Sequence, residues 1–435
     1  MKKLVSILLV AILCCAFVLP AMAEEKIHLT YSGFGYDDES TNEQKALNWG
    51  LSNYVETHKE TVEVEVTSMS HDDYQTKMLA LAAADDLPDV MIVKGSWLEN
   101  FAENGLLADL TDYAQALPYY SDYNGGSFDW MTYKGRIYGA PRMHAGGSSM
   151  VFYNEEIWKE AGYETFPATF EELFAAAEKI APTGLTPLVF ANGGKWEFEC
   201  CMFSLIANRY TGDEWFESIK MRDGKASFTD ECFIKALEFA QKLGTSTLVN
   251  PDYNMLDYQG AIDVYCQGKA AALVSGSGNL YIETNGPEGL AEKTKMVTLP
   301  LNEDAAYNKP DAISNAAGWF VGVNAKLTGA ELEAAMEMAF ALNGKEVCEY
   351  AASTFGNPTW IAVDVELPEV SPLTTKMLDF YSTYPVGVPI YDCVLDGSII
   401  DVLNTGLQEV LAGTMEPMTL AQQLQEVQLE LAEGI

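Results

Sequence analysis

The first hundred residues alternate between strand-like and helix-like patterns, and this order limits the fold more than any other feature. The apolar runs at 27–32 and 89–93 and the alternating valines of 62–66 are typical of strands. Between these runs, the segments 47–54 and 74–81 repeat apolar residues at helical spacing. Strands that alternate with helices predict an α/β fold with a parallel sheet covered by helices. Ligands of such sheets bind beyond the carboxyl ends of the strands.

The chain is too long for a single core. Its 435 residues exceed what one hydrophobic core usually organises, so two lobes are expected. Beyond the amino terminus no apolar run is long enough to span a bilayer, and the sequence contains neither repeats nor a Pro- or Ser-rich linker. Lobes that share one chain by crossing several times need no such flexible tether.

The amino terminus has the pattern of a secretory signal peptide. Two lysines precede an apolar run from 4 to 19, which is followed by Pro20 and by Ala-Met-Ala at 21–23. A membrane anchor is the alternative, but the run is near the lower limit of about 17 residues for a spanning helix. The two cysteines in the run lack the small preceding residue of a lipid anchor. We therefore predict that 1–23 is cleaved and that the protein is exported, to the periplasm or to the cell exterior or surface.

The chain is strongly acidic. It has 63 acidic against 26 basic side chains, a net charge of −37 at pH 7. Binding to nucleic acid requires clustered Lys and Arg, so nucleic acid is not expected as a partner, and anionic membranes are not expected as direct ligands. The acidity favours a solvated surface over a dedicated cation site.

Cysteine and histidine spacings give no support for metal chemistry. No C-x-x-C, H-x-x-H or H-E-x-x-H arrangement is present, so neither a metal nor a cofactor is expected. In an exported chain some cysteines could pair, although small buried thiols are an equally good interpretation. The cysteines outside the apolar leader are Cys200, Cys201, Cys232, Cys266, Cys348 and Cys393.

The stretch from 133 to 180 carries the most specific motif. A Tyr-Gly-x-Pro step at 138–141 precedes an apolar strand that ends in Tyr-Asn, at 151–154. A helix start follows, with Ala-Gly at 161–162 and Pro-x-Thr-x-Glu-Glu-Leu at 167–173. This order resembles the extracellular solute-binding proteins of ABC transporters, family 1, which are the maltose-binding-protein-like carbohydrate-binding proteins.

Further motifs extend the resemblance over nearly the whole chain, at 87–90, 101–110, 271–276, 317–319 and 413–424. Each motif is weak alone, but together they occur in the family's order. The resemblance implies a two-lobed periplasmic-binding-protein-like fold of type II, with a ligand cleft between lobes joined by a three-segment hinge. It also implies a monomeric, non-catalytic receptor. Such a receptor captures a carbohydrate ligand, which is expected to be an oligosaccharide, and delivers it to the ABC permease subunits in the membrane.

The same resemblance implies where the chain crosses between the lobes. The first crossing is the 138–141 step, the second lies near Met296 and the third near 343–344. Glycine and proline punctuate these segments, as hinges allow. The expected parts are lobe 1 at 24–139 plus 296–343, and lobe 2 at 140–295 plus 344–435.

Candidate ligand residues follow by position in the resemblance. The loop after the first strand contributes Tyr36 and Asp37, and the loop after the third strand has Ser96 and Trp97 where the family relative has a carboxylate and a guanidinium. Arg142 and His144 lie just after the crossover proline, where the relative has a ligand-binding carboxylate; here there is none, and two extra residues intervene. The full set of candidates is Tyr36, Asp37, Ser96, Trp97, Arg142, His144, Trp196, Glu197, Asn279, Trp319 and Trp360.

Aromatic and polar side chains of this kind suit a sugar. A pyranose has apolar faces that flat rings can cover, and its hydroxyl rim needs hydrogen-bond partners when it is buried. Two alternatives stay open. The acidic run that follows Tyr36 could suit a polyamine, and an exported glycoside hydrolase or lyase would use two carboxylates about 5 to 9.5 Å apart. No Ser/His/Asp motif, G-x-S-x-G elbow or phosphate loop supports catalysis.

Overall fold

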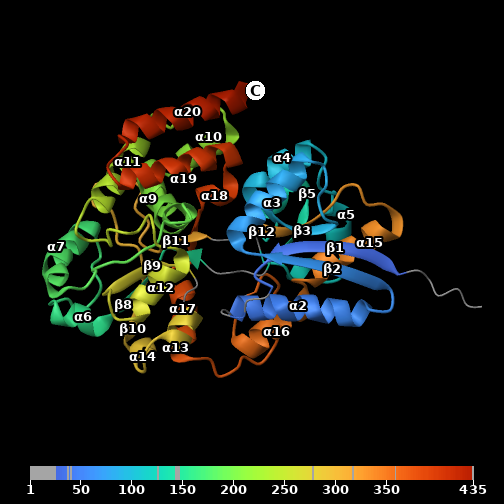
Figure 1. Cartoon of the computed structure of the whole chain (residues 1–435), viewed down its shortest axis with the longest axis horizontal. Helices are drawn as coiled ribbons and strands as arrows, with labels where there is room; N and C mark the ends of the chain where they lie inside the picture. Colours follow the sequence, from blue (N-terminus) through green and yellow to red (C-terminus); the bar gives the residue numbers. More distant parts are fainter. Residues whose placement is uncertain are drawn as a thin grey trace, which may run out of the picture.

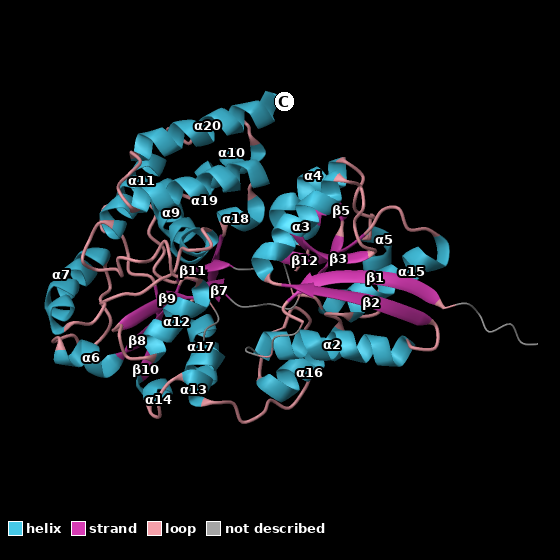
Figure 2. Ribbon diagram, viewed as in Figure 1, coloured by secondary structure: helices cyan, strands magenta, loops and turns pink. Residues whose placement is uncertain are grey.

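The computed structural model describes residues 26–36, 39, 42–124, 127–142, 147–276, 279–315, 318–357 and 359–433. The described part forms two lobes that lie side by side (Figure 1), each with helices packed around strands (Figure 2). The signal peptide predicted at 1–23 lies outside the described residues. No helix in the described part is long and apolar enough to cross a membrane.

Lobe 1 is built on a sheet with the strand order β2-β1-β3-β12-β6. β1 is parallel to both β2 and β3, whereas β12 is antiparallel to β3 and to β6. The predicted order of strands and helices in the first hundred residues is confirmed. The elements of lobe 1 are β1 Ile27–Phe34, α2 Asn42–His58, β2 Val62–Met69, α3 His71–Ala83, β3 Val90–Lys94, η1 Gly95–Trp97, α4 Leu98–Glu103, α5 Thr111–Ala116, η2 Tyr120–Asp122, η3 Asp129–Met131, β4 Thr132–Tyr133, β5 Arg136–Ile137, β6 Gly139–Pro141, β12 Trp319–Val323, α15 Gly329–Ala341 and α16 Lys345–Phe355.

Burial explains this sheet. All five residues of β3 are buried, as expected for a central strand with both faces covered. β2 lies at the edge of the sheet, and Val66 on it is exposed. On the helices, Leu47 and Leu51 of α2 and Met78 of α3 are buried, so the helical spacing predicted from the sequence marks the core faces.

Lobe 2 has two small sheets, with strand orders β10-β8-β9 and β13-β11-β7, inside a larger set of helices. Its elements are β7 Gly147–Ser148, β8 Met150–Asn154, α6 Glu155–Glu160, α7 Phe170–Ile180, η4 Ala181–Thr183, α8 Trp196–Phe198, the π-helical turn η5 Glu199–Phe203, α9 Ser204–Thr211, α10 Asp213–Met221, α11 Glu231–Gly244, α12 Tyr258–Cys266, β9 Ala272–Ser275, α13 Asn279–Asn285, α14 Leu290–Lys293, β10 Thr294–Thr298, β11 Ala312–Asn315, α17 Pro372–Thr383, β13 Val386–Pro389, α18 Tyr391–Val394, α19 Gly397–Leu411 and α20 Pro417–Glu433.

The described elements change lobe at three places. These are between β6 and β7, between β11 and β12, and between α16 and α17. The first lies a few residues beyond the boundary expected after residue 139, since β6 still pairs with β12 of lobe 1. The lobes are therefore interleaved in sequence and are not contiguous domains.

The second crossing differs from the expected position near Met296. β10 pairs antiparallel with β8 along its whole length, from Thr294 to Thr298, and so belongs to lobe 2. The Leu-Pro step after β10 is also fixed, because the buried Arg209 donates to the Leu299 carbonyl at 2.9 Å. The chain returns to lobe 1 only at β12, so residues 296–315 move from the expected lobe 1 to lobe 2.

The third crossing also comes later than the expected 343–344. α16 packs on α2, where Val347 and Ala351 form a buried cluster with Ala46 and Leu47. The chain remains on lobe 1 at Ala362, whose amide donates to the Asp122 carbonyl at 2.8 Å. An apolar helix face binds α16 to lobe 1, so the glycine-punctuated turn before it is not a lobe boundary.

All six cysteines outside the leader lie within the described residues, and each of them is free. Cys201, Cys266, Cys348 and Cys393 are buried. Burial raises the pKa of Cys266 and of Cys348 to about 11, so these thiols are held in the neutral form. They behave as small buried apolar groups, which was one of the two interpretations of the sequence.

Candidate functional site

An aromatic cluster lies at the carboxyl ends of the lobe 1 strands. Phe34 ends β1, His71 begins α3, and Trp319 begins β12, which is antiparallel and therefore starts beside the ends of the other strands. The ring centroids of Phe34 and Trp319 are 4.8 Å apart, and those of Phe34 and His71 are 5.1 Å apart. The cluster thus occupies the edge where an α/β sheet usually binds its ligand.

Lobe 2 extends the cluster across the gap between the lobes. Trp196 of α8 lies 5.6 Å from His71 and stacks on Tyr258 of α12 at 5.5 Å, measured between ring centroids. Two hydrogen bonds hold the Tyr258 hydroxyl, which accepts from the Ser275 hydroxyl at 2.8 Å and from the Gly276 amide at 3.0 Å. Both lobes therefore contribute rings to one continuous aromatic surface.

The local chain geometry before α8 aims Trp196 at the other lobe. Lys195, immediately before it, has a φ of 72°, a left-handed conformation that is uncommon outside glycine. The Gly194 amide donates to the Glu197 carboxylate at 3.1 Å, and the Phe198 amide donates to the Asn192 side chain at 3.2 Å. The buried Glu197 carboxylate thus stabilises the turn that positions Trp196.

Arg142 follows β6 directly and lies against Phe34 of the cluster. Its guanidinium carbon is 4.4 Å from the Phe34 ring centroid, in the geometry of a cation–π contact. Tyr36 and Glu43 are close enough to feel its charge. Burial raises the pKa of Tyr36 and that of Glu43, and the nearby Arg142 charge only partly offsets this in each case.

A buried ion pair joins the lobes beside the cluster. Lys94, at the end of β3, donates to the Asp392 carboxylate of α18 at 2.5 Å, and both side chains are buried. Burial alone would lower the pKa of Lys94. The charge and the hydrogen bond of Asp392 outweigh this effect, so the pKa is raised above its usual value. Glu199 lies next to this pair, and its carboxylate accepts from the Tyr391 amide at 3.2 Å and from the Asp392 amide at 3.3 Å.

A second inter-lobe contact lies further along the same side. Arg222 donates to the Glu99 carboxylate at 2.8 Å, above a crevice of about 530 Å³ whose lining includes Trp130. The candidate Trp360 packs here, 4.8 Å from the Trp130 ring. The structure therefore places Trp360 with Trp130 and not among the rings around Trp319.

The other candidates fall into three groups. Tyr36, Arg142, Trp196 and Trp319 are gathered around the aromatic cluster. Ser96 and Trp97 are buried, and Trp97 packs between Phe101 at 5.7 Å and Trp319 at 5.6 Å, so it supports the cluster from within the lobe 1 core. Asp37 and His144 lie outside the described residues, as does the side chain of Asn279, whose backbone begins α13.

Sequence reasoning missed Phe34, His71, Glu43 and Tyr258, and it missed the Lys94–Asp392 pair. A usable signal existed for two of them, because Phe34 ends the first strand and His71 follows the second. Both positions are at the carboxyl ends of parallel strands, where ligand contacts gather. Tyr258 reaches the site by packing on Trp196, which is distant from it in sequence, and Asp392 reaches it through the contact between the lobes. Neither contact can be inferred from a local sequence pattern.

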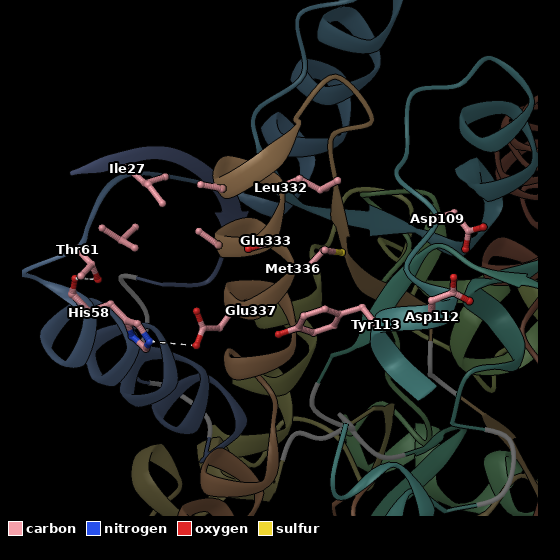
Figure 3. A pocket seen from close by; sticks show the side chains of 13 residues that line it. Ile27, His58, Thr61, Asp109, Asp112, Tyr113, Leu332, Glu333, Met336 and Glu337 are labelled. Atoms are coloured by element: carbon pink, nitrogen blue, oxygen red, sulfur yellow. Dashed lines mark hydrogen bonds and ion pairs between the residues drawn. The ribbon is translucent and has the colours of Figure 1, made fainter. Parts of the chain in front are cut away.

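Lobe 1 also has a groove at its other end. Figure 3 shows this groove, which has a volume of about 820 Å³ and is lined by α15 and by the first residues of β1 and β2. One side of it is closed by an ion pair of 3.5 Å between His58 and Glu337. Because Ile27 and Val62 begin their strands, the groove lies at the amino ends, away from the candidate site.

In the described part of the chain, no three His, Cys, Asp or Glu side chains are grouped so as to hold a metal ion. The candidate site instead offers flat rings, a guanidinium and phenol hydroxyls. These groups can cover apolar faces and bind polar rims of an organic solute.

Comparison with known proteins identifies the family. The family of bacterial extracellular solute-binding proteins matches residues 52–371 of the chain. The chain belongs to this family. The resemblance found in the sequence is thereby confirmed.

Curated relatives within the solute-binding family are distant. A protein of Mesorhizobium japonicum named a probable sugar-binding periplasmic protein is 24% identical over 49% of this chain and 50% of its own length. An uncharacterised ABC transporter extracellular-binding protein of Pyrococcus horikoshii is 28% identical over 32% of this chain and 31% of its own length. The aligned region thus spans half or less of the length of these relatives.

Solved structures share the fold over nearly the whole chain. A chitin oligosaccharide binding protein superposes with a TM-score of 0.81 at 20% identity, covering 93% of this chain and 98% of its own. A T. maritima protein bound to maltose gives a TM-score of 0.74 at 20% identity, with 93% and 99% covered. The predicted two-lobed α/β fold of the binding-protein type is confirmed.

Proposed function

We propose that the protein is the substrate-binding receptor of an ABC importer and that it captures an oligosaccharide between its two lobes. The observation that carries this proposal is the aromatic surface shared by the lobes, in which Trp196 meets His71 and Trp319 lies against Phe34. Flat rings cover the C–H faces of a sugar, while Arg142, Tyr36 and Glu43 supply partners for its rim. The sugar ligands named for the relatives support the same class of solute.

The partner of the loaded receptor would be the permease of the importer, and the receptor would act outside the cytoplasmic membrane. The family's extracellular description and the signal-peptide pattern support this location. A ligand that contacts rings on both lobes would favour the closed state, because a ligand shifts a conformational equilibrium through its extra contacts in one state. We therefore expect a hinge motion at the crossings.

The two alternatives are less well supported by the geometry. A polyamine would be repelled by the Arg142 guanidinium, which faces the same rings as the proposed sugar. A glycoside hydrolase needs two carboxylates that reach the substrate. Among the described carboxyl groups near the cluster, Asp392 and Glu199 are buried against Lys94 and backbone amides, and burial raises the pKa of Glu43.

Calorimetric titration of the purified protein with neutral and acidic oligosaccharides, amino acids and polyamines tests the proposal. A saccharide should bind and raise the melting temperature by mass action, and chromatography should recover it unchanged. Binding only to polyamines or amino acids would contradict the ligand class, and turnover of a bound saccharide would contradict the receptor role. X-ray scattering of the free and saturated protein should show a smaller radius of gyration when saturated.

A further inference from the structure

Among the residues that the structure describes, Arg142 has no carboxylate as a counter-ion. Its side chain is half-buried, and its Nε is buried without a hydrogen-bond partner among the described residues. The other three arginines of the chain all have oxygen partners. Arg136 is 3.1 Å from Asp109, Arg222 is 2.8 Å from Glu99, and Arg209 donates to the Leu299 carbonyl at 2.9 Å.

The absence is unusual in this chain because carboxylates outnumber cations by 63 to 26. No described Asp or Glu lies within ion-pair distance of the Arg142 guanidinium. Glu43 is the acid whose pKa responds to Arg142, yet burial keeps that pKa above its usual value. A carboxyl group that burial pushes toward its neutral form is a weak counter-ion.

The other described groups that the charge of Arg142 reaches are phenols. Its charge acts on the phenols of Tyr31, Tyr36 and Tyr74, and burial raises the pKa of each of them. The guanidinium carbon lies 4.4 Å from the Phe34 ring centroid, and a guanidinium can stack on an aromatic ring while its N–H groups bind an oxyanion. The site thus holds a pre-positioned positive charge among hydrogen-bonding groups and aromatic rings.

We infer that the ligand carries a carboxylate that Arg142 binds, so that the solute is an acidic oligosaccharide built from uronic acids. This inference rests on the proposed sugar-binding function. A guanidinium presents two parallel N–H groups that match the two oxygens of a carboxylate, and such a pair is stronger than a bond to a neutral hydroxyl. A uronic acid bears its carboxylate at the ring edge, so its faces stay free to stack on Trp196 and Trp319 while the edge meets Arg142.

The test compares ligands that differ only in charge. Disaccharides and trisaccharides of galacturonic, glucuronic and mannuronic acid are titrated beside their methyl esters, which keep the shape and lose the charge. Neutral hexose oligomers and a simple dicarboxylate, succinate, complete the set. The proteins are the wild type, Arg142→Gln, and the matched control Arg136→Gln, whose arginine is an exposed residue of lobe 1 paired with Asp109.

At least one free acid should bind the wild type about 10- to 100-fold more tightly than its ester, the value of a hydrogen bond to a charged group. Arg142→Gln should remove that preference while retaining ester binding, and Arg136→Gln should keep the preference. Equal affinity for acid and ester, or binding of neutral hexose oligomers alone, would overturn the inference and leave the proposed function standing. If folded wild type bound no saccharide, or bound succinate as tightly as the uronates, the sugar receptor itself would be refuted together with the inference.

Discussion

Two cations lie on the aromatic cluster between the lobes, and their surroundings differ. The Lys94 ammonium is 5.8 Å from the Trp319 ring centroid, and the Arg142 guanidinium is 4.4 Å from that of Phe34. Lys94 reaches across to the other lobe and bonds Asp392 at 2.5 Å. Arg142 has no carboxylate within ion-pair distance in the described part of the chain.

Lys94 makes its ionic contact within the protein, whereas we assign the ionic contact of Arg142 to a ligand. Around Lys94 the lobes touch closely, since a Cβ added to Gly318 would lie 2.2 Å from the Cys393 sulfur. Only glycine permits this approach, so no ligand group can fit at that point. Around Arg142 the described residues supply rings and hydroxyls but no carboxylate within ion-pair distance. We therefore interpret the Lys94 end as the closed end of the cleft and the Arg142 end as the end that recognises the solute.

The largest expected effect comes from breaking the closed end. Asp392→Asn leaves Lys94 charged and buried without its anion, and this should lower the free energy of unfolding by about 3 to 5 kcal/mol. Urea unfolding followed by circular dichroism measures the loss. The control is Asp396→Asn. The Asp396 carboxylate is more exposed than that of Asp392, and its distance of 3.9 Å from the Arg222 guanidinium is long for an ion pair. If both substitutions had the same small effect, the buried pair would not hold the lobes together.

A double substitution sharpens this result. Lys94→Met with Asp392→Leu replaces the pair by apolar groups of similar volume, and such replacements are often neutral in stability. Recovery of the free energy of unfolding in the double variant would show that the cost lies in the unpaired charge. Continued loss would instead point to damage in the packing around Cys393.

The two tryptophans that contact the cluster should separate binding from stability. Both are ligand candidates from the sequence, and truncation of a ring that covers a ligand should weaken binding by about 1 to 3 kcal/mol. In the structure only Trp196 faces the other lobe, while Trp97 packs in the lobe 1 core. Trp196→Ala should therefore weaken saccharide binding by about that amount with little change in unfolding.

Trp97→Ala should mainly lower the free energy of unfolding, because it leaves a cavity behind Trp319. Trp49→Ala is a suitable control, since Trp49 stacks on Tyr350 between α2 and α16 of lobe 1. Titration and unfolding of the three variants distinguish the roles. A normal affinity in Trp196→Ala would remove this ring from the proposed site.

Local patterns predicted much of the fold. The apolar spacing of residues such as Leu47, Leu51 and Met78 located the first helices, because helix faces are set by residues close in sequence.

The crossings near Met296 and after residue 343 were placed wrongly. β10 joins lobe 2 by pairing with β8, which is far away in the chain, and α16 joins lobe 1 through a packed face. Glycine and proline mark where a chain can turn, and they do not show which lobe the next element packs on.

The site was predicted less completely. Arg142, Trp196 and Trp319 were named from their positions in motifs, and the structure gathers them around one cluster. Phe34 and His71 were not named, although both follow the carboxyl ends of strands, and the Lys94–Asp392 pair joins residues on different lobes. Pairs of this kind depend on how the two lobes meet, so a single sequence read segment by segment does not reveal them.

The effect expected within one pH unit is the smallest of these, and it concerns the proton balance at the closed end, where Glu199 and Asp392 lie beside the buried Lys94. Burial raises the pKa of Glu199 to about 8, the charge of Asp392 adds to this, and the hydrogen bond from Ser204 opposes it. The unfolded chain loses this proton near the usual 4.5, so between 4.5 and about 8 the folded state binds more protons than the unfolded state. The free energy of unfolding should therefore fall as the pH rises through this interval, by up to about 1.4 kcal/mol per pH unit, and the Glu199 contribution should become constant above it.

Glu199→Gln removes the titrating group and should flatten this part of the pH profile relative to the wild type. Urea unfolding from about pH 5 to about pH 9 measures the difference, and Glu238→Gln, an exposed glutamate of lobe 2, is the control. If the Glu199→Gln profile paralleled the wild-type profile, Glu199 would be ionised in the folded protein. The closed end would then hold two full negative charges against one positive charge. In that case the contrast with the Arg142 end would rest on packing around Gly318 and Cys393 and not on a balanced set of charges.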